Sequence, residues 1–491
     1  MDSLEKKLEW VSHRLALEEW EFNGSGYSDS LNFYRDLYLF IISSSELFQS
    51  AVDDKNITDR AERQRLQILL SETLTDRIEL RPSIAAAKDS IYALIDSFKV
   101  DFQGEVKSLA QVKGIYFNSR SRTQREQACR AWFSVGEELS PRLTKIIKER
   151  NAAATKLGFE NYWDLISSQF SQNGVDIVEF VRSIDSVTQP ANTSLFEEAR
   201  AGLGINQIEL WDIPFFSTQV NDQANAFFPA DSQLGFAKRG LASVGFNIDK
   251  LPIFIQEVTK RPVKFDIKSY SVKPPHDVRV LINLRNGFES MHALFYHIGI
   301  ALHSVYIAQE RPLYNFASDT TWQMAMGETI SSMTKDSAWL KNIVNMPSGF
   351  ISTFRISQYQ QEVFRQRLLL ANTIFIYEAY SNPDRDLNRL YWDIYQKFTG
   401  LPRHEDIIIW ASLREMISEP INPVRELVAK AIAAQSVNYM TSFFGPFINN
   451  PNTSSFLIQN YFRFGSRYAW SEMLQRGTGE RLSPNHLKKL F

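Results

Sequence analysis

The sequence predicts a mainly α-helical protein that contains one small β-sheet. Apolar residues recur at three- and four-residue spacing over long segments, for example residues 30–51, 63–98 and 354–380. Strand-like patterns concentrate in residues 262–267 and 278–284. No internal repeat or low-complexity tract interrupts the chain. Its 491 residues are enough for a large core or for two lobes around a cleft.

Charge, cysteine content and apolar runs limit the binding partners and the cell compartment that we expect. The formal net charge is -2, with 44% hydrophobic and 22% charged residues, so no bulk field attracts nucleic acid or an anionic membrane. The single cysteine, Cys129, excludes an internal disulfide and a cysteine-rich metal site. The first residues lack an apolar signal-peptide stretch, and no apolar run reaches membrane-spanning length. We therefore expect a cytoplasmic protein.

The two strand-like segments precede the most informative helix. Turn-forming residues 273–277 separate them, Gly287 ends the strand pattern, and helical spacing resumes over about residues 289–306. We expect this helix to follow directly after an edge strand.

That helix carries the sequence Tyr-His-Ile-Gly-Ile-Ala-Leu-His at residues 296–303. In the motif His-Glu-x-x-His, two histidines four residues apart share one helix face and bind zinc, while the Glu activates water. The corresponding positions here hold Tyr296, His297 and Ile300. A second frame that starts at His297 places Ala301 at the second ligand position, so both frames lack the histidine pair.

The flanking residues Leu294, Gly299, Ala301 and His303 resemble the zinc helix of the thimet oligopeptidase and oligoendopeptidase F family of gluzincins. Residues 150–162 are similar to another segment of that family, Arg-Asn-x-x-Ala-x-x-Leu-Gly-Phe-x-Asn-Tyr. Further similar passages are residues 203–212, the strand at 280–283, which resembles the substrate-side edge strand, and the closing stretch 470–480. The resemblance covers roughly residues 125–491 and implies a helical clamshell with a deep central cleft.

The resemblance also identifies where other functional groups of the family would lie. Glu328 corresponds to the third zinc ligand. In residues 415–426 the family places a His and two Tyr groups that stabilise the oxyanion, whereas this chain has Glu415, Asn422 and Glu426. Carboxylates there would repel a developing oxyanion. We expect an N-terminal helical region over residues 1–120 and a peptidase-like domain over 121–491.

A rebuilt metal site is an alternative. His297 and His303 are about 120° apart around a helix, and His292 and His303 are separated by ~16 Å along it, so neither pair chelates one ion. Glu289 and His292 could reach a common ion with Glu328, although this pair lies one to two turns before the motif. We expect no metal and no cofactor.

Structural roles account for the same residues. Tyr296 and Ile300 suit a buried helix face, and a lone histidine such as His297 is commonly hydrogen-bonded in place. Without a metal, Glu328 must be solvated, protonated or paired, with Arg279, Arg285 or Arg414 as available partners.

The first functional hypothesis is a pseudopeptidase that binds a peptide or a protein partner in the cleft without cutting it. Residues expected to line that cleft are His303, Arg414, Glu415, Asn422 and Glu426. The second is a repurposed, metal-independent enzyme in which His297, Tyr296 and Glu328 perform acid–base chemistry on a small molecule or peptide-derived substrate. A purely structural subunit and an active metallopeptidase with a rebuilt site are further alternatives.

Overall fold

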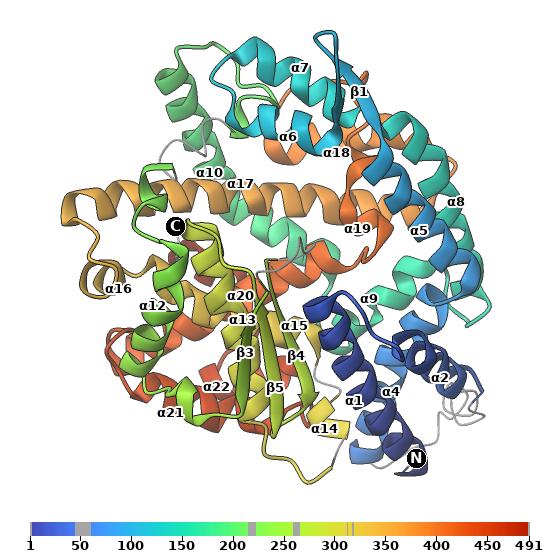
Figure 1. Cartoon of the computed structure of the whole chain (residues 1–491), viewed down its shortest axis with the longest axis vertical. Coiled ribbons are helices and arrows are strands. Elements are labelled where there is room, and N and C mark those ends of the chain that lie inside the picture. The colour runs from blue at the N-terminus through green and yellow to red at the C-terminus, as the bar shows by residue number, and fades with distance from the viewer. Residues whose placement is uncertain are drawn as a thin grey trace. The chain divides into compact units, whose positions relative to one another are not determined.

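The computed structural model describes residues 2–44, 60–214, 222–258, 266–311, 313–316 and 319–489 (Figure 1). The described chain is mainly α-helical, which confirms the predicted fold class, and it has two small sheets where the sequence predicted one: the two-stranded sheet within residues 99–108 was missed. Within these residues, no helix combines the length and apolar character needed to cross a membrane.

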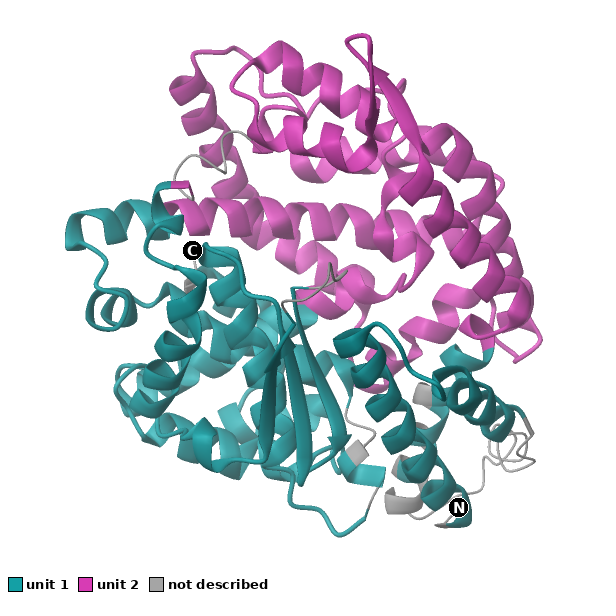
Figure 2. Ribbon diagram, viewed as in Figure 1, with its two compact units in different colours: residues 1–77, 223–355, 428–490 teal, residues 78–222, 356–427, 491 magenta. Residues whose placement is uncertain are grey.

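The chain divides into two compact units, drawn in different colours in Figure 2. Unit 1 comprises residues 1–77, 223–355 and 428–490, and unit 2 comprises residues 78–222, 356–427 and 491. The expected boundary near residue 120 separates family-like from generic sequence and stays a prediction.

Helices wholly within unit 1 are α1 (Asp2–Ser25), α2 (Leu31–Ser44), α12 (Ala230–Ser243), η1 (Ile248–Lys250), α13 (Phe288–Val305), α14 (Leu313–Phe316), α15 (Thr320–Ser331), η2 (Ser332–Lys335), α16 (Ser337–Asn342), α21 (Asn452–Asn460), η4 (Phe462–Phe464), α22 (Trp470–Thr478) and η5 (Pro484–Lys489). Elements wholly within unit 2 are α5 (Pro82–Ser97), β1 (Lys99–Phe102), β2 (Glu105–Ser108), α6 (Leu109–Asn118), α7 (Arg122–Phe133), α8 (Gly136–Thr155), α9 (Tyr162–Gln172), α10 (Ile177–Leu203), α18 (Leu387–Thr399), η3 (Trp410–Ser412) and α19 (Arg414–Ile417). The residue ranges of α4 (Arg60–Glu79), α17 (Ser348–Ser381) and α20 (Asn422–Phe444) fall in both units.

The predicted helical segments are largely confirmed. Residues 31–44 of the first segment form α2, and residues 45–51 lie outside the described residues. The segment 63–98 is two helices, because Pro82 lacks an N–H and begins α5 at its first turn. The segment 354–380 lies inside α17.

The sheet of unit 1 has the strand order β3-β5-β4, with β3 (Ile253–Glu257) parallel and β4 (Ile267–Lys273) antiparallel to β5 (Asp277–Ile282). The second predicted strand is confirmed as β5, and the turn at 273–277 joins β4 to β5. Most of the first, residues 262–265, lies outside the described residues. The expected edge position of the second strand is wrong, because β3 pairs with its free side and makes β5 the central strand.

The sheet positions α13 through the side-chain alternation of β4. Tyr270 and Val272 pack with Leu17 and Trp20 of α1. Ser269 and Ser271 point the other way, toward α13, where Ser271 Oγ lies 2.8 Å from Ser304 Oγ. This alternation is the expected geometry of a strand covered on both faces. The predicted small sheet beside the helix at 289–306 is therefore confirmed.

Helices α13 and α15 approach to backbone contact through two glycines. A Cβ on Gly299 would lie 2.8 Å from the Met326 carbonyl oxygen and 2.9 Å from Ile330 Cβ. A Cβ on Gly327 would lie 2.8 Å from two carbon atoms of the Tyr296 ring. Only residues without a side chain permit this separation, so the glycine pair fixes which residues of α13 face α15.

We predict that Gly299→Ala lowers the free energy of unfolding by about 1–3 kcal/mol, because the new methyl group overlaps α15 backbone and side-chain atoms. Chemical denaturation monitored by circular dichroism measures the change. Gly114→Ala is the matched control, since no atom lies within 4 Å of a Cβ at this α6 position. An equal effect of both substitutions would contradict the close-packing argument.

Candidate functional site

The positions at which the sequence resemblance implies zinc histidines lie on α13. Tyr296 and Ile300 are four residues apart and therefore share a helix face. The Tyr296 ring packs against Gly327 of α15, the residue before Glu328. The Tyr296 ring of α13 therefore lies against α15, directly beside the position that precedes Glu328.

His297 is oriented toward the sheet. Its Nδ1 atom lies 3.3 Å from Ser269 Oγ on β4. Burial, with a smaller contribution from Lys268, lowers the pKa of His297 to about 4, so the imidazole is neutral near pH 7. Such a group accepts a proton poorly at neutral pH, because effective general bases have pKa values near the working pH.

Glu328 is paired with Lys430 of α20. The distance from Lys430 Nζ to Glu328 Oε2 is 3.3 Å, and the two side chains are only 7% and 16% exposed, respectively. Of the three states considered for Glu328 without a metal, the structure has the paired one, and the partner is Lys430 instead of one of the three arginines. Arg279 pairs with Asp277 at 2.8 Å and Arg285 with Asp266 at 3.0 Å, while Arg414 lies in unit 2.

His303 is completely buried and packs edge-on against the Phe462 ring, with 5.7 Å between ring centroids. Neither ring nitrogen has a hydrogen-bond partner among the described residues. Burial lowers the pKa of His303 to about 4, so the neutral imidazole acts as a core side chain.

The residues present do not fit the zinc ion that the family resemblance implies. Tyr296 and Ile300 replace nitrogen ligands, His297 contacts Ser269, and Glu328 is held by an ammonium group. Among the described residues, no group of three or more His, Cys, Asp or Glu side chains is arranged to hold a metal. The alternative set of Glu289, His292 and Glu328 forms no such group either: Glu289 is exposed, and His292 Nδ1 lies 2.9 Å from Thr334 Oγ1.

The remaining predicted residues lie in unit 2. Glu426 of α20 forms an ion pair with Arg365 of α17 at 2.7 Å, and Asn422 hydrogen-bonds to Glu419. Glu415 lies near Tyr391, whose pKa is raised by burial and, to a lesser extent, by this carboxylate. Arg414 is exposed. Glu426 and Asn422 therefore bind neighbouring side chains of their own unit.

The segment at 150–162 forms a buried anchor in unit 2. Arg150 is fully buried and donates to Tyr380 Oη at 2.9 Å, to the Met416 carbonyl at 2.9 Å and to Glu79 Oε2 at 2.8 Å. Tyr162 Oη donates to the same Glu79 carboxylate. These contacts hold α8, α9, α17 and α19 around one charge pair, which gives the residue pattern a structural role.

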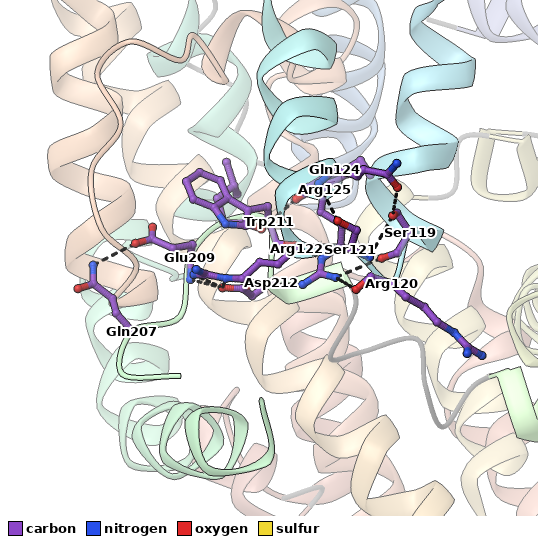
Figure 3. Close-up of polar contacts among 12 residues, drawn as sticks. Ser119, Arg120, Ser121, Arg122, Gln124, Arg125, Gln207, Glu209, Trp211 and Asp212 are labelled. Carbon is purple, nitrogen blue, oxygen red and sulfur yellow. Dashed lines mark hydrogen bonds and ion pairs between the residues drawn. The ribbon is translucent and has the colours of Figure 1, made fainter. Parts of the chain in front are cut away.

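A second charged anchor surrounds Asp212 (Figure 3). Asp212 is fully buried and accepts two hydrogen bonds of 2.9 Å from Arg122, one of 3.2 Å from Arg125 and one of 3.0 Å from the Glu209 N–H. Arg125 also donates to the Trp211 carbonyl at 2.8 Å. The loop that carries Trp211 and Asp212 is thereby fixed to the start of α7.

The described fold is mainly α-helical, with a small sheet packed beside α13. The family comparison is more specific: residues 115–243 match the model of Peptidase family M3. The resemblance to the thimet oligopeptidase and oligoendopeptidase F family is confirmed over this segment, which includes Arg150 and Asp212 and ends before α13. No curated protein matches the chain.

The sequence did not predict two residues that contact the candidate site, Lys430 and Ser269. Lys430 is the only charged residue in the buried apolar run 427–434, and a lone charge there signals a buried counter-ion. Ser269 had no comparable signal, because its contact with His297 depends on the pairing and orientation of β4.

The buried histidine makes stability depend on pH. The pKa of His303 falls from 6.5 to about 4 on folding, so the unfolded chain binds the extra proton. Above pH 6.5 His303 is neutral in both states and does not reduce the free energy of unfolding. As the pH falls from 6.5 toward 4, the unfolded chain takes up the proton and the free energy of unfolding decreases. We predict that His303→Phe weakens the pH dependence of the unfolding free energy in this window, measured by denaturant titration.

His276→Gln, at an exposed turn position, is the control and should leave the dependence unchanged. His297 contributes in the same direction, so some dependence should remain in the His303 variant. Identical curves for the natural chain and His303→Phe would contradict a buried neutral imidazole.

The Asp212 anchor generates a second prediction for this region. Asp212→Asn should lower the free energy of unfolding by about 3 kcal/mol, because it leaves the buried Arg125 and the half-exposed Arg122 without their carboxylate. Thermal and chemical unfolding measure the loss. Asp231→Asn, at an exposed position of α12, should change stability far less.

Proposed function

We propose that the protein is an oligopeptidase-like pseudopeptidase, which binds an extended peptide or a segment of a partner protein without hydrolysing it. The observation that carries this proposal is the state of the α13–α15 contact. Tyr296 fills the space against Gly327, and the Glu328 carboxylate is bound by Lys430. The groups that would activate water on a metal in the related peptidases are replaced together.

The sheet beside α13 supports a peptide as the ligand. Within the described residues, β3 and β4 are the outer strands of this sheet. A strand edge presents N–H and C=O groups that pair with an extended peptide, and this mode of recognition needs no catalytic group.

The Ser269–His297 contact favours the second candidate, a metal-independent enzyme. A hydroxyl beside an imidazole can form a nucleophile and base pair. The lowered pKa of His297, about 4, counts against this activity, because so weak a base removes the hydroxyl proton of Ser269 inefficiently. Binding without chemistry therefore ranks first.

The test combines elemental analysis and peptide hydrolysis on protein purified without a chelator or a histidine tag. We expect no stoichiometric zinc or other transition metal. Unstructured fluorescent peptides should bind, as measured by fluorescence anisotropy, and should be recovered intact by mass spectrometry.

Cleavage that a chelator abolishes, together with one metal ion per chain, would refute the proposal. Cleavage that is insensitive to chelator and lost in Ser269→Ala would favour the second candidate. Ser271→Ala is the matched control for that variant, because Ser271 lies on the same face of β4 but contacts Ser304.

A further inference from the structure

A buried cation stands beside the carboxylate of Glu328. Lys430 lies in α20 among the buried residues Val428, Ala429, Ala431 and Ile432, all of which are fully buried. Burial of its aliphatic stem is favourable, but the ammonium group requires a counter-charge. Glu328 Oε2, at 3.3 Å, supplies that charge from α15.

We propose that Lys430 provides, as a fixed part of the chain, the positive charge that a divalent cation would otherwise provide beside Glu328, and that it thereby excludes metal from this carboxylate. The inference deepens the proposed function and rests on it. It assigns to Lys430 a specificity role: the site discriminates against divalent cations.

The physical argument concerns both partners of the pair. Removing either charge takes this counter-charge away from the other in a largely buried setting, so the ammonium stabilises a carboxylate that has no metal. A divalent cation approaching Glu328 would meet a like charge within a few ångströms. It could bind only if the ammonium moved away or lost its proton, and both changes weaken metal binding.

The experiment restores the ligands and varies Lys430. The restored chain carries Tyr296→His, His297→Glu and Ile300→His, which recreate His-Glu-x-x-His with Glu328 as the third protein ligand. It is compared with the same chain that also carries Lys430→Met. Zinc affinity is measured by calorimetric titration, and cobalt(II) absorption spectra report whether the bound metal is four-coordinate.

We expect zinc to bind at least about 100-fold more tightly when Lys430 is replaced, because the like charge is removed while the ligands are unchanged. Zinc should then also raise the melting temperature of the Lys430→Met restored chain far more than that of the restored chain alone. Lys341→Met in the restored chain is the matched control, because it removes an equal charge from an exposed position of α16. It should leave zinc affinity unchanged.

Equal zinc affinity with and without Lys430 would overturn the proposal. Failure of both restored chains to bind zinc would overturn it too, because replacing Lys430 would not be sufficient to admit the metal. Elemental analysis of the natural chain tests the proposed function separately: bound metal there would remove the function, whatever the restored chains do.

A thermodynamic cycle in the natural chain keeps the proposal testable if a restored chain does not fold. Glu328→Gln and Lys430→Met should each lower the melting temperature, and the double variant should lose less than the sum of the two. Additive losses would show that the pair is not coupled and would overturn the assignment of Lys430.

Discussion

The backbone contact between α13 and α15 is the constraint on which the candidate site depends. Gly299 and Gly327 allow the two helices to touch, and a side chain at either position would collide with atoms of the opposite helix. Helix packing at this distance fixes rotation as well as separation, since ridges on one surface must fit grooves on the other. As a result Tyr296 is placed against Gly327, Glu328 follows at the next position of α15, and His297, one residue along α13, contacts the sheet.

Three buried carboxylates are each balanced by one or more cationic side chains of the protein. Glu328 has Lys430, Asp212 has Arg122 and Arg125, and Glu79 has Arg150. Burial would raise the pKa of Glu79, but Arg150, Lys88 and the Tyr162 hydroxyl together outweigh burial, and the pKa is lower than the ordinary value. Each pair joins elements that are distant in sequence, so these charges specify tertiary contacts while the apolar core supplies most of the stability. The Glu328 pair differs because the sequence resemblance implies a metal ligand at this position.

Local patterns in the sequence predicted what local forces decide. Helical periodicity predicted α2 and α17, the turn at 273–277 separated two strands, and the motif spacing predicted α13. The central position of β5 was missed because its parallel partner β3 lies about twenty residues earlier, and no local pattern reports such pairing. Lys430 was missed for the same reason: it is about one hundred residues from Glu328, and only the fold brings α15 and α20 together. The segment at 150–162 was recognised as a pattern, but its role as an anchor for Glu79 and Tyr380 required the structure.

The two faces of α13 show why a zinc site at these positions would require several substitutions together. Neighbouring residues on a helix point about 100° apart, so the ligand positions 296 and 300 and the intervening position 297 meet different surroundings. A histidine at 296 alone would still face Ile300 and a carboxylate bound to Lys430. A glutamate at 297 alone would carry a charge into a buried setting beside Ser269, at a desolvation cost that the nearby Lys268 ammonium would offset only in part. Because intermediate combinations leave a buried charge or an incomplete ligand set, the present arrangement of Tyr296, His297 and the Glu328–Lys430 pair is self-consistent without metal.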